Sequence, residues 1–193
     1  VSGLRTALAM GAAKAILVSD DELKGAGALD TAKVLAAAIG RAEGYDLVLA
    51  ATESSDGYTG TVPEQIAAVL GLPSITFAKS VEVADGTVKV KRQTEAGYDE
   101  CESPLPALVS VTAGVVEPRY PSFKGIMAAK SKPVDTVTVA DLGIDAGIVG
   151  WAGAGQEIID VSAAPERQAG EVIEDDGEAH LKIVEFLDGL KVL

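Results

Sequence analysis

The sequence has few of the side chains that carry most site chemistry: one cysteine, Cys101, one histidine, His180, one tryptophan, three phenylalanines and four tyrosines. A structural zinc site needs about four nitrogen or sulfur ligands, which Cys101 and His180 cannot supply. A Ser-His-acid triad would have to use His180, which lies in an acidic run, and no nucleophile-elbow sequence is present. The shortage of aromatic rings argues against stacking on nucleic-acid bases. We therefore expect no metal site and no triad hydrolase, and we interpret His180 as a solvated surface residue.

Positive charge and long apolar runs are also scarce. The 16 Lys and Arg residues and 29 Asp and Glu residues give a net charge of −13. This charge disfavours binding to nucleic acids and to anionic membrane surfaces. The longest apolar runs, such as residues 47–51, are far shorter than the roughly 20 residues of a membrane span. The first residues do not have the pattern of a signal peptide, and a lone cysteine fits a reducing compartment. We expect a soluble cytoplasmic protein and, because the first residue is Val1, a processed or truncated chain.

What the sequence does contain is enough apolar residues, 48% of 193, to build a compact core. Helical patterns alternate with short apolar runs in the first part of the chain. Predicted helices cover residues 4–11, a segment through residue 40 with Asp30 as N-cap, and residues 64–70, while predicted strands cover residues 15–19, 47–51 and 74–77. This order predicts an α/β fold with a parallel sheet.

The pattern changes after residue 80. Residues 81–90 alternate apolar and polar around the turn Asp85-Gly86, which predicts a β-hairpin, and residues 98–103 predict a further antiparallel strand. Residues 105–111 and 134–139 predict buried strands. From about Gly143 the chain is Gly/Ala-rich and acidic until an apolar segment at residues 181–193, which is typical of an arm. We expect a domain at residues 1–142 and an arm at residues 143–193.

Residues 54–63 are the best candidate for a ligand site. They join the carboxyl end of a predicted parallel strand to a helix start, which is where open α/β sheets bind ligands. Gly57 and Gly60 allow close approach of the backbone, and free N–H groups at the helix start favour an anion such as phosphate. The loop has no lysine, and the chain has no Walker A or Gly-x-Gly-x-x-Gly motif, so binding is favoured over catalysis. The alternative is a polar loop with ordinary capping.

Residues 117–130 are the second candidate. This proline-stiffened segment carries the apolar residues Phe123, Ile126 and Met127 within a basic stretch of an otherwise acidic chain. An apolar anchor with a charged rim is typical of a transient protein interface. The alternative is a connection whose apolar side chains pack inward.

Several motifs, in the same order along nearly the whole chain, resemble the β subunit of electron transfer flavoproteins. The motifs are residues 5–12 (RTALAMGA), Thr59-Gly60, residues 90–97 (VKRQTEAG) leading to residues 105–111 (LPALVSV), and residues 117–130 (EPRYPSFKGIMAAK). The match continues through residues 141–144 and 165–170. Members of this family begin with a further βα unit before the first motif, and this chain starts at the motif itself.

The resemblance implies a cytoplasmic bacterial heterodimer. Its α subunit holds the redox-active FAD, and its β subunit contributes a Rossmann-like (adenine nucleotide alpha hydrolase-like) domain with an antiparallel hairpin layer and an extended C-terminal arm that packs on α. Such heterodimers accept electrons from dehydrogenases, notably the acyl-CoA dehydrogenases of fatty acid β-oxidation, and pass them to a quinone oxidoreductase of the respiratory chain. The β subunit is then an electron-carrier subunit without catalytic residues of its own, and it binds AMP in a structural role.

The resemblance also implies site residues. The AMP loop consists of Ser54, Ser55, Asp56, Gly57, Tyr58, Thr59, Gly60, Thr61, Val62 and Pro63. The partner-docking residues, within a recognition loop at residues 117–133, are Arg119, Tyr120, Phe123, Lys124, Ile126 and Met127. Phe123 occupies the position of the apolar anchor that enters a dehydrogenase pocket. Thr61 stands where the family commonly has Gln, so a side-chain amide contact to the nucleotide is replaced by a hydroxyl.

Three alternatives remain at this point. Within the family, a bifurcating flavoprotein would hold a second FAD in the nucleotide site and oxidise NADH. A stand-alone nucleotide-sensing module of the stress-protein kind would share the α/β architecture without an α subunit. A hydrolase using Asp56 and Thr59 on a phosphate is the weakest alternative, because neither a metal cluster nor a catalytic lysine accompanies them.

Overall fold

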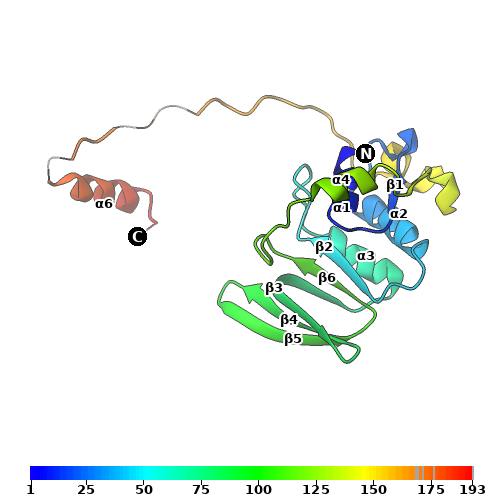
Figure 1. Cartoon of the computed structure of the whole chain (residues 1–193). Coiled ribbons are helices and arrows are strands. Elements are labelled where there is room, and N and C mark those ends of the chain that lie inside the picture. Colours follow the sequence, from blue (N-terminus) through cyan, green and yellow to red (C-terminus); the bar gives the residue numbers. More distant parts are fainter. Residues whose placement is uncertain (168–169, 171, 176, 193) are drawn as a thin grey trace. The chain divides into compact units, whose positions relative to one another are not determined.

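A computed structural model describes residues 1–167, 170, 172–175 and 177–192 (Figure 1). The chain forms two compact units, Val1–Glu157 and Ile158–Leu193. The first contains the sheets and most of the helices, and each unit is described below by itself.

Helices and parallel strands alternate in the first part of the Val1–Glu157 unit. The elements are α1 (Ser2–Ala9), β1 (Ala15–Val18), α2 (Ala28–Gly40), β2 (Leu47–Ala51) and α3 (Val62–Leu70). Strand β1 pairs in parallel with β7 (Val134–Val137) in a two-stranded sheet. Strand β2 pairs in parallel with β6 (Ala107–Val111), and β6 pairs in parallel with the start of β3 (Ser74–Ala84). The predicted α/β fold with parallel strands is confirmed.

The antiparallel strands extend one edge of this second sheet, whose order is β2-β6-β3-β4-β5 (Figure 1). Strand β4 (Thr87–Thr94) pairs with the end of β3, and β5 (Gly97–Pro104) pairs with β4. The β3–β4 turn is Asp85-Gly86, with φ of 52° and 74°. A two-residue turn with positive φ at both positions matches the twist of a hairpin. The predicted hairpin and its third strand are therefore confirmed.

Strand β6 organises the core because its two faces contact different layers. Leu108 packs with Ala32, Ala36, Ile66 and Ala67 of helices α2 and α3. The flanking residues Ala107 and Val109 point to the opposite face, where they pack with Ile75, Ala78, Val88 and Val90 of β3 and β4. Helix α2 contributes to a third cluster through Val34. The alternation of side chains along β6 thus joins the helical layer to the hairpin strands.

Helix α2 begins earlier than the sequence predicts. Its N-cap is Gly27, and the predicted N-cap, Asp30, lies inside the first turn with only 6% of its surface exposed. There it pairs with Lys33, with 3.6 Å between Oδ1 and Nζ. An acidic side chain in the first turn complements the helix dipole. Asp30 therefore marks the start of α2, as predicted, but it lies within the first turn and is not the N-cap.

The Val1–Glu157 unit continues past residue 142, where the sequence predicts the start of the arm. Two short 3₁₀ helices, η2 (Ala140–Leu142) and η3 (Ala146–Ile148), are followed by α5 (Gly150–Gly153). Val149 is fully buried with Val34 and Val139. The Trp151 N–H donates to the Lys24 carbonyl at 2.8 Å. Residues 143–157 therefore belong to the compact unit.

The Ile158–Leu193 unit contains helix α6 (Ala179–Gly189). Four of its large apolar side chains are exposed within this unit, and so is His180, as expected. These apolar side chains are Leu181, Ile183, Val184 and Phe186. Over the described parts of both units, every helix is too short or too polar to cross a membrane.

Candidate functional site

The loop at residues 54–63 leaves the carboxyl end of β2 and enters α3, as predicted. Its first half is held by bonds within the loop. The Gly57 N–H donates to Ser54 Oγ at 3.2 Å and to Asp56 Oδ1 at 2.8 Å, and the Tyr58 N–H donates to the Ser54 carbonyl at 3.2 Å. A hydrogen bond from the Ser54 side chain, followed by backbone N–H bonds, holds the pKa of Asp56 below its usual value. The loop therefore presents an ionised carboxylate.

The second half of the loop is shaped by backbone conformation. Tyr58 has a φ of 46° and Gly60 a φ of 69°. Positive φ is costly for a bulky residue and free of that cost for glycine. The exposed Tyr58 thus carries local strain, which is typical of functional loops. The two positions turn the chain so that Thr61 becomes the N-cap of α3.

The start of α3 offers hydrogen-bonding groups that the chain itself leaves unused. The Thr61 side chain makes no capping bond to the helix backbone, so the first backbone N–H groups of α3 receive no side-chain cap. Within the described chain, Thr61 Oγ1 accepts only from Gln65 Nε2, at 3.4 Å. Two buried acceptor atoms, Glu64 Oε2 and Gln65 Oε1, have no hydrogen-bond partner within the described part of the chain. Helix-start N–H groups suit a phosphate, and unpaired oxygens suit the hydroxyl or amino donors of a nucleoside. The residues present fit a nucleotide, although the loop supplies no cation and Asp56 opposes an anion.

A cavity of about 770 Å³ lies at the same edge of the sheet. Thr52, just before the loop, lines it together with Thr112 after β6, Arg92 of β4 and Phe77 of β3. Phe77 has a φ of 55° where the register of β3 shifts, and its N–H donates to the buried Ser110 Oγ at 3.2 Å. The bulge at Phe77 was not predicted from the sequence, because a bulge inside an apolar strand does not change the pattern of apolar residues from which the strand is predicted.

Within the second candidate segment, residues Phe123–Ala129 form helix α4. Ser122 is its N-cap, and its Oγ accepts from the Gly125 N–H at 3.0 Å. Tyr120 is 93% exposed and Phe123 80% exposed, and Ile126 and Met127 are exposed as well. These apolar side chains do not pack into the Val1–Glu157 unit, so the segment presents an apolar surface to solvent.

Helix α4 is fastened to α1 by two basic side chains, one from each side of the contact. Arg5 of α1 donates from Nη1 to the Ala129 and Lys132 carbonyls, at 2.6 and 2.8 Å. Lys132, just after α4, donates from Nζ to the Leu8 and Ala12 carbonyls, at 2.9 and 2.6 Å. Each side chain therefore satisfies carbonyls at the C-terminal end of the other helix, where positive charge is favoured. We call these four bonds the Arg5–Lys132 clasp.

Gly125 allows the two helices to approach closely. A Cβ atom at this position would overlap the Ala9 carbonyl oxygen of α1. Neither the clasp nor this contact was found from the sequence. The available signal was a glycine inside a helical pattern, which usually has a packing reason.

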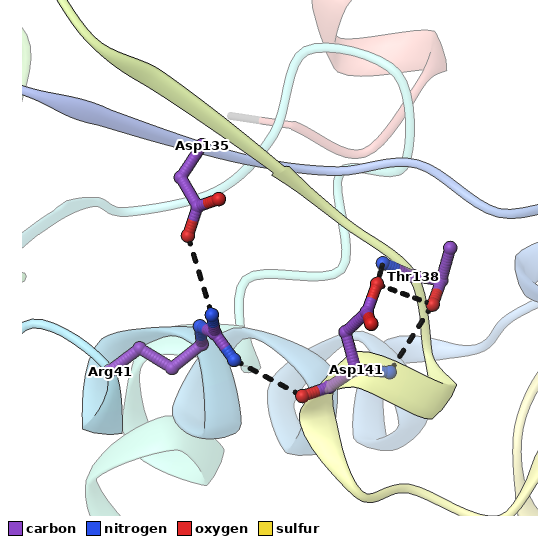
Figure 2. Close-up of polar contacts among 4 residues, drawn as sticks. All are labelled: Arg41, Asp135, Thr138 and Asp141. Atoms are coloured by element: carbon purple, nitrogen blue, oxygen red, sulfur yellow. Dashed lines mark hydrogen bonds and ion pairs between the residues drawn. The ribbon is translucent and has the colours of Figure 1, made fainter.

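A polar cluster fastens the β1–β7 sheet to α2 (Figure 2). The Arg41 guanidinium donates to the Asp141 carbonyl at 3.1 Å and lies 3.4 Å from Asp135 Oδ2. The Thr138 N–H and hydroxyl donate to Asp141 Oδ2, at 2.8 and 2.7 Å, and they hold the pKa of Asp141 below its usual value. The carboxylate and guanidinium are used within the fold, so we interpret this cluster as structural.

Comparison with known proteins decides the family. The family model for the electron transfer flavoprotein domain matches residues 1–142. The chain is 43% identical over 190 residues to the electron transfer flavoprotein subunit beta of Mycobacterium leprae, covering 98% of this chain and 71% of that one. The chain belongs to the electron transfer flavoprotein family. Its resemblance to the β subunits of that family is confirmed.

Other relatives agree with the assignment. The β subunit of Megasphaera elsdenii is 34% identical over 200 residues, covering 98% of this chain and 74% of that one. The caffeyl-CoA reductase-Etf complex subunit CarD of Acetobacterium woodii is 35% identical over 170 residues, covering 88% and 65% of the two chains. An electron transfer flavoprotein works with a flavin, and a β subunit implies an α partner.

Proposed function

We propose that this β subunit, together with an α subunit that holds FAD, carries electrons from flavin dehydrogenases such as acyl-CoA dehydrogenases to a quinone oxidoreductase of the respiratory chain. The exposed Phe123 on the fastened helix α4 is the observation that supports this role most directly. A single large apolar side chain on a rigid support is typical of an interface anchor. We place this activity in the cytoplasm and in fatty acid β-oxidation.

In this proposal the chain binds and docks, and the flavin supplies the redox chemistry. Residues 54–63 hold AMP, with N–H groups at the start of α3 donating to its phosphate. The buried oxygens Glu64 Oε2 and Gln65 Oε1 are available to accept from its hydroxyl or amino groups. The AMP stabilises the loop and takes no part in electron transfer.

The proposed division of the chain follows from these roles. Residues 1–142 form the nucleotide-binding domain with the recognition loop at residues 117–133. Of the predicted arm at residues 143–193, residues 143–157 pack within the Val1–Glu157 unit, and residues 158–193 form the part that packs on α. The exposed apolar side chains of α6, such as Ile183 and Phe186, support the last assignment, because an unpartnered apolar helix face favours burial against another protein.

The test uses the heterodimer co-expressed with its α subunit. Native mass spectrometry is expected to show one FAD and one AMP per heterodimer, and a purified acyl-CoA dehydrogenase with its substrate is expected to reduce the flavin. Phe123→Ala should raise the KM for the dehydrogenase about tenfold or more, while FAD content stays unchanged. Unaltered reduction kinetics in Phe123→Ala would contradict the anchor role.

The relationship to CarD, a subunit named for a reductase complex, favours one second candidate. In that case the nucleotide site holds a second FAD, and the heterodimer oxidises NADH. Ligand released from the purified heterodimer distinguishes the two: AMP supports the first proposal, and a second equivalent of FAD supports the bifurcating one.

A further inference from the structure

An open groove of about 520 Å³ lies between α1 and α4, beside the proposed anchor. Its lining combines Thr6 and Ala9 of α1 with Pro121, Ile126, Ala129 and Lys130. Phe123 does not line the groove, and its side chain projects into solvent. The surface around α4 therefore has both a projecting apolar group and an apolar recess.

The walls of the groove are held in place within the chain. The Arg5–Lys132 clasp ties the C-terminal ends of both helices to each other, and Gly125 brings their backbones close. Leu8, on the inner side of α1, is 1% exposed and anchors that helix in the unit. A recess between two fastened helices loses little conformational freedom when it is filled, which favours binding.

The charges around the groove identify the chemistry of its partner. Residues 118–132 contain four basic residues and no acidic one, although the chain as a whole carries a net charge of −13. Within the described residues, the side chains of Arg119, Lys124 and Lys130 form no hydrogen bond or ion pair. Unpaired cations beside an apolar recess complement an acidic protein surface that presents an apolar side chain.

We propose that the α1–α4 groove is a second docking point, which receives an apolar side chain from an acidic surface of the electron-donating dehydrogenase. Docking is then reciprocal: Phe123 enters the partner, and the partner enters the groove. This inference rests on the proposed function and deepens it by defining the partner surface.

The test fills the groove without touching Phe123. Thr6→Phe in the heterodimer places a ring at the lining of the groove, and Ala7→Phe is the matched control, since Ala7 is the next exposed residue of α1 and does not line it. With a purified acyl-CoA dehydrogenase as electron donor, Thr6→Phe should raise its KM about tenfold and leave kcat unchanged. Ala7→Phe should match the parent. Lys130→Gln should flatten the dependence of KM on ionic strength.

Ile126→Ala, which enlarges the groove, gives a second reading if the bulky variants lower the yield of heterodimer. It should also raise KM. Unchanged KM in both Thr6→Phe and Ile126→Ala, with Phe123→Ala impaired, would overturn the groove inference and leave the proposed function standing. Unchanged KM in all three variants would overturn the dehydrogenase-docking function itself. An equal loss in Thr6→Phe and Ala7→Phe would show a general disturbance of α1 and would also overturn the groove.

Discussion

Helix α4 and the loop at residues 54–63 are both exposed candidate sites, and they are held in opposite ways. Residues 120 or more positions away in the sequence fasten α4, through the Arg5–Lys132 clasp. The first half of the loop is held by bonds that span at most four residues, such as that from Tyr58 to Ser54. The proposed docking surface is thus built by tertiary structure, whereas the loop is built by local turn chemistry.

The two sites also differ in what they leave unpaired. Around α4, the clasp satisfies backbone carbonyls at the end of the helix, while other cations and apolar side chains remain exposed. Such a surface suits a protein partner that associates and dissociates. At the start of α3, buried acceptor oxygens remain unpaired. Buried polar groups without partners are costly, so a ligand that donated to these oxygens would stabilise the site. The contrast supports transient docking at α4 and a resident nucleotide at the loop.

Separating α4 from α1 should have the largest effect of the changes considered. Gly125→Val places a branched side chain against the Ala9 carbonyl, and neither helix can move away without breaking the Arg5–Lys132 clasp. We expect the free energy of unfolding to fall by about 3 kcal/mol, the upper range for overpacking. Thermal unfolding of the heterodimer measures this loss.

The matched control is Ala128→Val, because Ala128 is an exposed residue of the same helix. It introduces the same side chain without an opposing backbone and should lower stability by about 0.5 kcal/mol. Equal losses in the two variants would show that the close approach of α4 to α1 is not what fixes the docking surface.

Removing one side of the clasp should have an intermediate effect. Lys132→Met keeps the length of the side chain and removes the Nζ donor from the Leu8 and Ala12 carbonyls. We expect a loss of about 1–2 kcal/mol, since one of these bonds is exposed and water replaces part of it. Lys130→Met, at a lysine whose side chain has no partner in the described chain, should be nearly neutral. Chemical denaturation of both variants checks the difference, and similar losses would exclude a specific role for the clasp.

The same contrast explains how much of the molecule could be predicted. The fold class, the hairpin at Asp85-Gly86 and the position of the loop after β2 follow from periodicity and turn residues, which act locally. The clasp joins Arg5 to Lys132, and no local pattern records such a pair. The β-bulge at Phe77 likewise depends on a neighbour distant in sequence, Ser110. The motif containing Phe123 was found, but the way it is supported needed the structure.

The smallest effect is expected in the locally held loop, at Asp56. The Ser54 side chain is the largest cause of the lowered pKa of Asp56, so Ser54→Ala should raise that pKa toward the value of a free aspartate. A carboxyl whose pKa is lower in the folded state stabilises the fold above its unfolded pKa and loses that contribution as pH falls through the folded pKa. Stability of the parent should therefore decline slightly on acidification below about pH 4, and the stability of Ser54→Ala should decline less.

NMR titration of the Asp56 carboxyl measures the pKa directly. A titration unchanged by Ser54→Ala would show that the turn does not depend on this side chain, and the contrast with the clasp would then rest on the backbone bonds alone.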